Sequence, residues 1–282
     1  MQKIFFCGTL AAVLVNAALA VSAKADPSPT STLSVSYAIA FWGIPLGHTN
    51  YEGALTDNTY SAKAHFETNG VVGAFWKSVI DATANGGISA HSVSPAIYDS
   101  YSRNRSNPLQ RMKVTFGNDN STIFADPVYD STKYPVSEAQ KKDSVDPMSA
   151  ATSILTGAKA DEEHPCGTGA QVFDGRRRYN VNLTYLKDEP VTLSNGLFNG
   201  SAHLCEIHYD AIAGYPQRIV SNRRAPPKIY ADFVDIPAGD APDGRYIVPV
   251  KLWSDMSLGT MTIMLDSIKI DGATALAMAA RN

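Results

Sequence analysis

The sequence is poor in charge, and neither sign dominates. Only 18% of its 282 residues are charged, and the formal net charge is −3 at pH 7. Proteins that bind nucleic acid usually carry a basic domain or a basic stripe. We therefore expect no nucleic acid among the partners of this chain.

Long apolar runs are missing after the first 25 residues. No later stretch approaches the roughly 18 apolar residues that a membrane-spanning helix needs, so we expect no transmembrane segment in the mature chain. Residues 1–25 have a basic start at Lys3, an apolar stretch, and Ala23-Lys24-Ala25, which is typical of a cleavage site. They predict a signal peptide cleaved after Ala25, a periplasmic location, a flexible arm over residues 26–32, and a single β-rich domain over residues 33–282.

Familiar catalytic motifs are also missing. The sequence has no nucleophile elbow, no zinc-protease helix pair, no phosphate-binding loop and no paired carboxylates on a predicted strand. His48, His65 and His91 are scattered along the chain, and each is more typical of a surface residue than of a catalytic base. We expect a protein that is not an enzyme and that uses no cofactor and no metal.

Signals for β-strands are abundant. Thirteen tyrosines, frequent Val, Ile and Thr, and Gly or Pro about every ten residues indicate an all-β, mainly antiparallel chain. In LSVSYAIAF the alternation puts Tyr37, Ile39 and Phe41 on one face. Roughly a dozen strands and one good helix predict an open barrel or a β-spiral wrapped on that helix.

The helix is predicted in DPMSAATSILTG. Asp146 stands at the N-cap position, Pro147 at the first helical position and Gly157 just past the end, which is the expected order of start and stop residues. Its apolar stripe predicts that the helix packs against the concave face of the sheet.

Two cysteines, Cys166 and Cys205, remain after the predicted cleavage. An even pair in an oxidising compartment favours a disulfide. The nearby His164 and His203 leave a tetrahedral zinc site open as an alternative, although the spacing is poor for it, and two free thiols are the third.

Three arginines follow the turn signal Asp174-Gly175. An Asp-Gly pair favours a two-residue type I′ turn, because both positions need positive φ. The strand that follows would place Arg177 on the apolar face with Tyr179, Val181 and Leu183. A buried guanidinium must be satisfied. Arg177 is therefore predicted to be a structural residue paired with a carboxylate or with carbonyl groups, and Arg176 and Arg178 to be exposed.

The export signal, the opening strand ending in WGIPLG, the DPMSAATSIL helix, and VFDGRRRYNV followed by CEIHYDAIAGY together resemble the proteobacterial domain-of-unknown-function family three-one-zero-eight. The resemblance covers nearly all of the mature chain and implies an exported, β-rich envelope protein. The general layout is similar to the cell envelope integrity proteins with a β-spiral and one disulfide, and more distantly to the LolA-like lipoprotein carriers. By the first of these similarities, the cysteine pair would be a bridge.

Two classes of function follow. The first is a non-enzymatic periplasmic protein that supports the cell envelope, either as a scaffold for an envelope protein or as a carrier of an apolar ligand such as a lipid or an acyl chain. Its expected lining residues are Tyr37, Ile39, Phe41, Tyr179, Val181 and Tyr185. The alternative is an envelope hydrolase acting on lipid or peptidoglycan, which needs a His or a carboxylate grouped with a nucleophile in a cleft.

Overall fold

The computed structural model describes residues 31–70, 73, 77–89, 92–104, 109–117, 120–158, 165–221, 227–238, 241, 244–271 and 273–274. The predicted signal peptide, most of the predicted arm, His91 and His164 lie outside these residues. Within them, no helix is long and apolar enough to cross a membrane.

The described part of the chain is mostly antiparallel strand, which confirms the predicted fold class. The first strands are β1 (Ser31–Phe41), β2 (Ile44–Leu55), β3 (Thr59–Thr68), β4 (Ser78–Ser89), β5 (Ser92–Asn104), β6 (Gln110–Thr115) and β7 (Thr122–Asp126). After the helices α2 (Glu138–Lys141) and α3 (Pro147–Leu155) come β8 (Gly169–Phe173), β9 (Arg178–Thr192), β10 (Asn199–Ala213), the helix α4 (Gln217–Val220), β11 (Ile229–Pro237), β12 (Arg245–Met256), β13 (Gly259–Ile270) and β14 (Ala273–Thr274).

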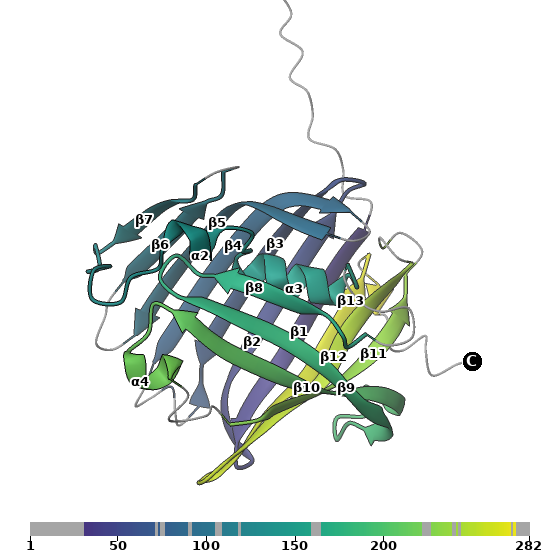
Figure 1. Cartoon of the computed structure of the whole chain (residues 1–282). Coiled ribbons are helices and arrows are strands. Elements are labelled where there is room, and N and C mark those ends of the chain that lie inside the picture. The colour runs from purple at the N-terminus through teal and green to yellow at the C-terminus, as the bar shows by residue number, and fades with distance from the viewer. Residues whose placement is uncertain are drawn as a thin grey trace, which may run out of the picture.

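The strands form one open sheet in the order β7-β6-β5-β4-β3-β2-β1-β13-β12-β11-β10-β9-β8, with β14 paired to β13. Two meanders, β1 to β7 and β8 to β13, are thus joined where β1 pairs with β13. β7 and β8 are the two ends of this order, so the barrel is not closed. Figure 1 shows the sheet curving around α3, with β8, β9 and β10 crossing in front of the first meander.

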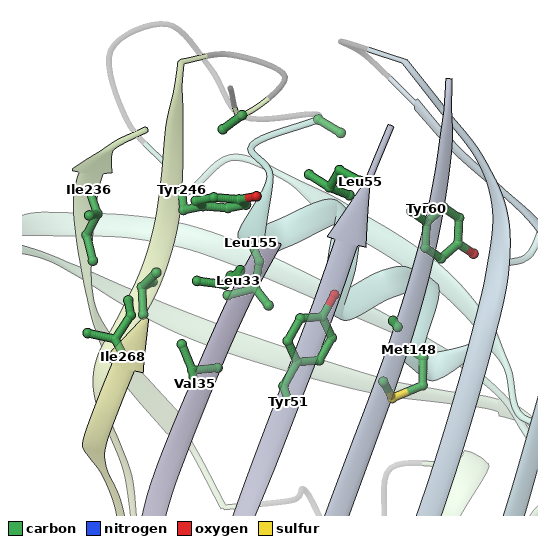
Figure 2. Packing of buried hydrophobic residues seen from close by; sticks show 14 of the residues in the cluster. Leu33, Val35, Tyr51, Leu55, Tyr60, Met148, Leu155, Ile236, Tyr246 and Ile268 are labelled. Atoms are coloured by element: carbon green, nitrogen blue, oxygen red, sulfur yellow. The ribbon is translucent and has the colours of Figure 1, made fainter. Parts of the chain in front are cut away.

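The core lies between the sheet and α3. Leu33, Val35, Tyr37 and Ile39 of β1 are buried in strict alternation, as a strand with one face on the core requires. Figure 2 shows the labelled members of this cluster: Leu33, Val35, Tyr51, Leu55, Tyr60, Met148, Leu155, Ile236, Tyr246 and Ile268. Met148 and Leu155 come from α3, which confirms that this helix packs on the concave face.

Asp146 holds the start of α3. Its side chain is fully buried and accepts hydrogen bonds from the backbone NH groups of Met148 and Ser149, both at 2.9 Å, and from the Ser149 hydroxyl. The Ser149 hydroxyl is also bonded to the Tyr60 hydroxyl of β3. One turn later, the Thr152 hydroxyl lies 2.7 Å from the Tyr51 hydroxyl of β2. The helix is therefore tied to the sheet by polar groups as well as by apolar contacts.

A second, smaller apolar cluster surrounds a disulfide between Cys166 and Cys205, whose Cα atoms are 6.1 Å apart. Leu183, Ala231, Phe233 and Ile247 are buried with it, and Ile154 of α3 packs against it. Because the two sulfur atoms form a disulfide, they are not available as thiolate ligands. The alternative of a zinc site at Cys166 and Cys205 is therefore wrong.

The turn after β8 differs from the predicted two-residue hairpin. Phe173 pairs with Arg178, so the loop has four residues, 174–177. The Asp174 carboxylate accepts hydrogen bonds from the backbone NH groups of Arg176, at 2.8 Å, and Arg177, at 2.6 Å, which stabilises the wider loop. Arg177 consequently belongs to the loop, not to the strand.

The prediction that Arg177 is the buried arginine is wrong. Arg177 is exposed, whereas Arg178 is 5% exposed. The Arg178 guanidinium donates to the carbonyl oxygen of Gln140 at 2.9 Å, to the carbonyl of Tyr179 and the side chain of Asn180 at 2.7 Å, and to the side chain of Gln171. Carbonyl groups satisfy this guanidinium, as expected for a buried arginine, but at the neighbouring position.

We predict that Asp146→Ala lowers the free energy of unfolding by about 2–4 kcal/mol, more than the roughly 1 kcal/mol of an exposed cap, because it leaves two buried NH groups and a buried hydroxyl without their acceptor. Asp146→Asn keeps one acceptor oxygen and should lose clearly less. Urea denaturation of the three proteins measures the difference. Equal losses for Ala and Asn would contradict the capping role.

We predict that Arg178→Ala destabilises the protein by about 2–3 kcal/mol, because the buried guanidinium and its four partly buried hydrogen bonds are lost. Arg176→Ala and Arg177→Ala should each stay within about 0.5 kcal/mol of the parent, since both side chains are exposed. Melting temperatures of the three single variants test this. A larger loss from Arg177→Ala than from Arg178→Ala would overturn the assignment.

Candidate functional site

The structure does not gather the six predicted lining residues into one cavity. Tyr37 and Ile39 are buried on β1, where Tyr37 belongs to the main core and its hydroxyl has no hydrogen-bond partner among the described residues. Phe41, Tyr179, Val181 and Tyr185 are half-buried. Val181 and Tyr185 pack against the disulfide cluster, and the Tyr179 ring stacks on Tyr209 with centroids 4.9 Å apart. A role for these residues in ligand binding stays a prediction.

A cavity of about 430 Å³ lies instead beside β7, the strand at one end of the sheet. We call it the edge groove. Its walls come from β7, from the segment 127–136, from α2 and from the end of β8. Most of the side chains that line it are apolar or aromatic: Ile123, Phe124, Ala125, Val128, Tyr129, Tyr134, Pro135, Val136 and Phe173.

Two of these apolar side chains are open to solvent. Phe124 is 51% exposed and Val128 is 89% exposed. The free energy falls when an apolar side chain leaves water. Apolar groups that stay exposed around a concave surface are therefore typical of a binding site. The edge groove therefore has the surface character that an apolar ligand requires.

A second cavity of about 330 Å³ adjoins the edge groove and shares Ala125, Tyr129 and Arg176 with it. Tyr129 lies between the two cavities. Its hydroxyl donates a hydrogen bond of 2.7 Å to the carbonyl oxygen of Gly175, and the Arg176 guanidinium lies 5.5 Å from the centre of its ring. The loop 174–177 thus contacts Tyr129, the residue that lies between the two cavities.

Cationic groups line an otherwise apolar groove. Lys141 of α2 bonds to Glu138 at 2.6 Å and lies 5.7 Å from the Phe173 ring. Arg176 is exposed and lines both cavities. In the same loop, burial raises the pKa of Asp174, while the two backbone hydrogen bonds that its carboxylate accepts oppose this rise. Arg176 is therefore the cation best placed to meet an anionic group of a ligand.

Sequence reasoning missed the edge groove because most of its wall is irregular chain. The segment 127–136, PVYDSTKYPV, contains Val128, Tyr129, Tyr134 and Val136 among turn-forming residues. Apolar residues concentrated in a loop are an available signal, because a solvated loop needs no apolar side chains. Nothing in the sequence, however, shows that this loop returns to the turn after β8.

Sequence reasoning also missed a pair of histidines. We expected His48 and His65 to stand apart. Instead, their ring centroids are 6.1 Å apart on the neighbouring strands β2 and β3. The hairpin register brings them together: His48 pairs with Glu67, and Asn50 pairs with His65.

A buried carboxylate lies in the second meander. Asp232 of β11 is 1% exposed, and one of its oxygen atoms has no hydrogen-bond partner among the described residues. Burial raises the pKa of Asp232 to about 6, and the nearby Glu189 adds to the rise, while Lys251 and Lys187 lower it. This acid does not line either of the two cavities.

Comparisons with known proteins give a family and a similar solved structure. The family described as "Protein of unknown function (DUF3108)" matches residues 32–231. No curated protein matches the sequence. Among solved structures, the chain is similar to the "Crystal Structure of Beta-barrel-like Protein of Domain of Unknown Function DUF1849 from Brucella abortus", with 11% sequence identity and a TM-score of 0.46. The match covers 86% of this chain and 98% of that one.

We predict that Asp232 makes the stability depend on pH. Its pKa is raised in the fold, so its contribution to stability is complete below the ordinary value of 3.8 and is lost as the pH rises through about 6. The free energy of unfolding should therefore fall across this window relative to that of Asp232→Asn, which does not titrate. Urea denaturation at several pH values measures both, and parallel profiles would contradict the prediction.

Proposed function

Since the chain belongs to the family Protein of unknown function (DUF3108), whose description assigns no activity, we propose a function from the structure itself. The protein is a non-enzymatic carrier of an amphipathic molecule that has an apolar chain and an anionic group, such as a fatty acid or an anionic lipid. The predicted signal peptide makes the periplasm the place where it acts. The observation that carries the proposal is the edge groove.

The size and the walls of the groove support an apolar chain. Its volume of about 430 Å³ falls within the roughly 300–1,000 Å³ of small-molecule sites. Another cavity of about 420 Å³ has a more polar lining, which includes Asn120, Glu138, Lys142 and Asp143, and it suits an apolar chain less well. The exposed side chains of Phe124 and Val128 leave the groove accessible from solvent, which favours loading and release over permanent burial.

Charge supports an anionic head group. A guanidinium binds a carboxylate or a phosphate through two parallel hydrogen bonds, and Arg176 stands where the two cavities meet. Lys141 contributes a second cation on the α2 side of the groove. A ligand whose chain lies against Phe124 and Val128 would place its head group near Arg176.

Two other roles stay open to test. As a scaffold, the protein would use the same exposed apolar residues to hold an envelope protein. As a hydrolase, it would need a nucleophile beside a base in a cleft. Among the residues that line the edge groove, Ser131 is the only serine, and there is no histidine to act as its base. This lining supports our proposal of binding, not turnover, at the edge groove.

The first experiment is mass spectrometry of the protein purified gently from its native periplasm. We expect a lipid or a fatty acid to co-purify at close to one molecule per chain. A co-purifying envelope protein with no lipid would favour the scaffold. Cleaved lipid or peptidoglycan fragments after incubation with either substrate would contradict a non-enzymatic role.

We predict that a fluorescent long-chain fatty acid binds the purified protein and that Val128→Asp and Arg176→Glu each weaken binding about tenfold or more, which is the loss of about one charge-assisted hydrogen bond or of the equivalent apolar contact. Leu258→Asp and Arg218→Glu are the matched controls, because these side chains are exposed away from the groove. Fluorescence titration at constant salt measures all five proteins. Equal affinity in the groove variants and the controls would exclude the edge groove as the site.

A further inference from the structure

We propose that the outer face of the β2–β3 hairpin is a binding site for a late first-row divalent metal ion, with Zn²⁺ as the ion to test first. The ligands are His48, His65 and Glu67. The site is separate from the edge groove, and it does not rest on the carrier role.

The hairpin register places the three side chains on one face. His48 on β2 lies directly opposite Glu67 on β3, and His65 is two residues before Glu67, so the period of two keeps it on the same side. This face is the reverse of the one that carries Tyr51 and Tyr60 into the core. The three ligands therefore stand on paired strands whose other face packs on the core, while the ligands themselves face solvent.

The distances are longer than hydrogen bonds, and one of them matches the spacing of two ligand atoms around one metal ion. His48 Nε2 lies 3.5 Å from Glu67 Oε1, and His65 Nε2 lies 3.9 Å from Glu67 Oε2. Both exceed the usual N–H···O hydrogen-bond length of about 2.7–3.2 Å. Zn–N and Zn–O bonds of about 2.0–2.2 Å at tetrahedral angles separate ligand atoms by about 3.3–3.6 Å. One donor atom from each of the three residues already lies within 4.8 Å of the others.

Further polar groups hold the two rings. His65 Nδ1 lies 2.7 Å from the Asp81 carboxylate on β4, and a carboxylate only accepts, so Nδ1 carries a proton; in the neutral ring, Nε2 then has the lone pair that a metal ion would use. The Asn69 Nδ2 group lies 3.2 Å from His48 Nδ1 and donates a hydrogen bond to it, so in the neutral ring the proton is on Nε2. For His48 Nε2 to bind a metal, this proton must move to Nδ1, and the Asn69 amide must turn so that its oxygen accepts it.

The donor set selects the kind of ion. Two imidazoles and one carboxylate suit Zn²⁺, Cu²⁺ or Ni²⁺, whereas Ca²⁺ and Mg²⁺ prefer oxygen ligands alone. The side chains of His48, His65 and Glu67 are 35%, 37% and 36% exposed. A metal held here would keep at least one position open to water or to a ligand atom from outside the protein.

Asp81 acts in this site as a positioning residue, because it contacts His65 and not the ion. Replacing such a partner of a metal-binding histidine typically weakens metal affinity about 10–100-fold. Asp81→Asn should therefore lower the affinity without changing the number of ions bound. Loss of a ligand should have the larger effect.

The test is Zn²⁺ binding to the mature protein, purified without a polyhistidine tag and stripped with a chelator, in competition with a chromophoric chelator. We expect one Zn²⁺ per chain. His48→Ala, His65→Ala and Glu67→Gln should each weaken binding by at least about 100-fold, which exceeds the effect of the positioning residue. His208→Ala is the matched control, since His208 is a strand histidine that also stands near a carboxylate, Glu206, at 4.0 Å.

Two further measurements separate a lost ligand from a misfolded variant. Circular dichroism and melting temperature without metal should match the parent for every variant, because the changed side chains lie on the solvent face. Zn²⁺ should raise the melting temperature of the parent and of His208→Ala, by mass action on the folded state, and should leave the ligand variants unchanged. Co²⁺ should give the visible absorption of a site with nitrogen ligands in the parent and in His208→Ala, but not in the ligand variants.

The proposal is overturned if the parent shows no saturable binding of Zn²⁺, Cu²⁺ or Ni²⁺. It is also overturned if His48→Ala and His65→Ala bind as tightly as the parent, or if His208→Ala loses binding to the same degree. In the first case the three side chains form only a surface ion pair, and in the others the ion binds elsewhere on the chain.

Discussion

The buried carboxylate of Asp146 is the interaction on which most of this structure depends. It caps α3 away from solvent, and the Ser149 hydroxyl that bonds to it also bonds to the Tyr60 hydroxyl of β3. Immediately before it, Val145 pairs in parallel with Val172 of β8. The same few residues thus fix the helix against the concave face and hold β8, the strand at one end of the sheet order. A neutral cap would avoid the cost of burying a charge, but it would accept fewer hydrogen bonds.

The edge groove follows from that arrangement. β8 ends at Phe173, which is one wall of the groove, and the loop after it supplies Arg176 and the Gly175 carbonyl that receives the Tyr129 hydroxyl. The irregular segment 127–136 is therefore tied to the second meander through the Tyr129 hydroxyl. A metal site on β2 and β3 would be built differently, because its geometry comes from a single hairpin register.

Local signals in the sequence predicted the local parts of the fold. The alternation in β1, the cap and the stop of α3, and the all-β class all depend on neighbouring residues, and the structure agrees with each. Arg178 shows where this reasoning ends. A four-residue loop forms in place of the two-residue turn expected for Asp174-Gly175, because the Asp174 carboxylate accepts hydrogen bonds from two backbone NH groups. In addition, Arg178 donates to the carbonyl of Gln140, 38 residues away in the chain. The edge groove and the histidine pair escaped prediction for the same reason, since both depend on which strand or loop lies beside which.

The seam between β1 and β13 has a consequence for how the chain folds. Within each meander, strands pair with their neighbours in sequence, so the pairings close short loops and can form early. The seam instead joins Leu33 to Ile270, nearly the whole described chain apart. Closing so long a loop costs more entropy than closing a hairpin does. Until β12 and β13 have been synthesised, α3 has only part of its core, and the first meander keeps β1 as an unpaired edge. The seam is therefore the pairing with the largest loop-closure cost, and a chain interrupted before β13 would carry an exposed, alternating apolar strand that favours aggregation.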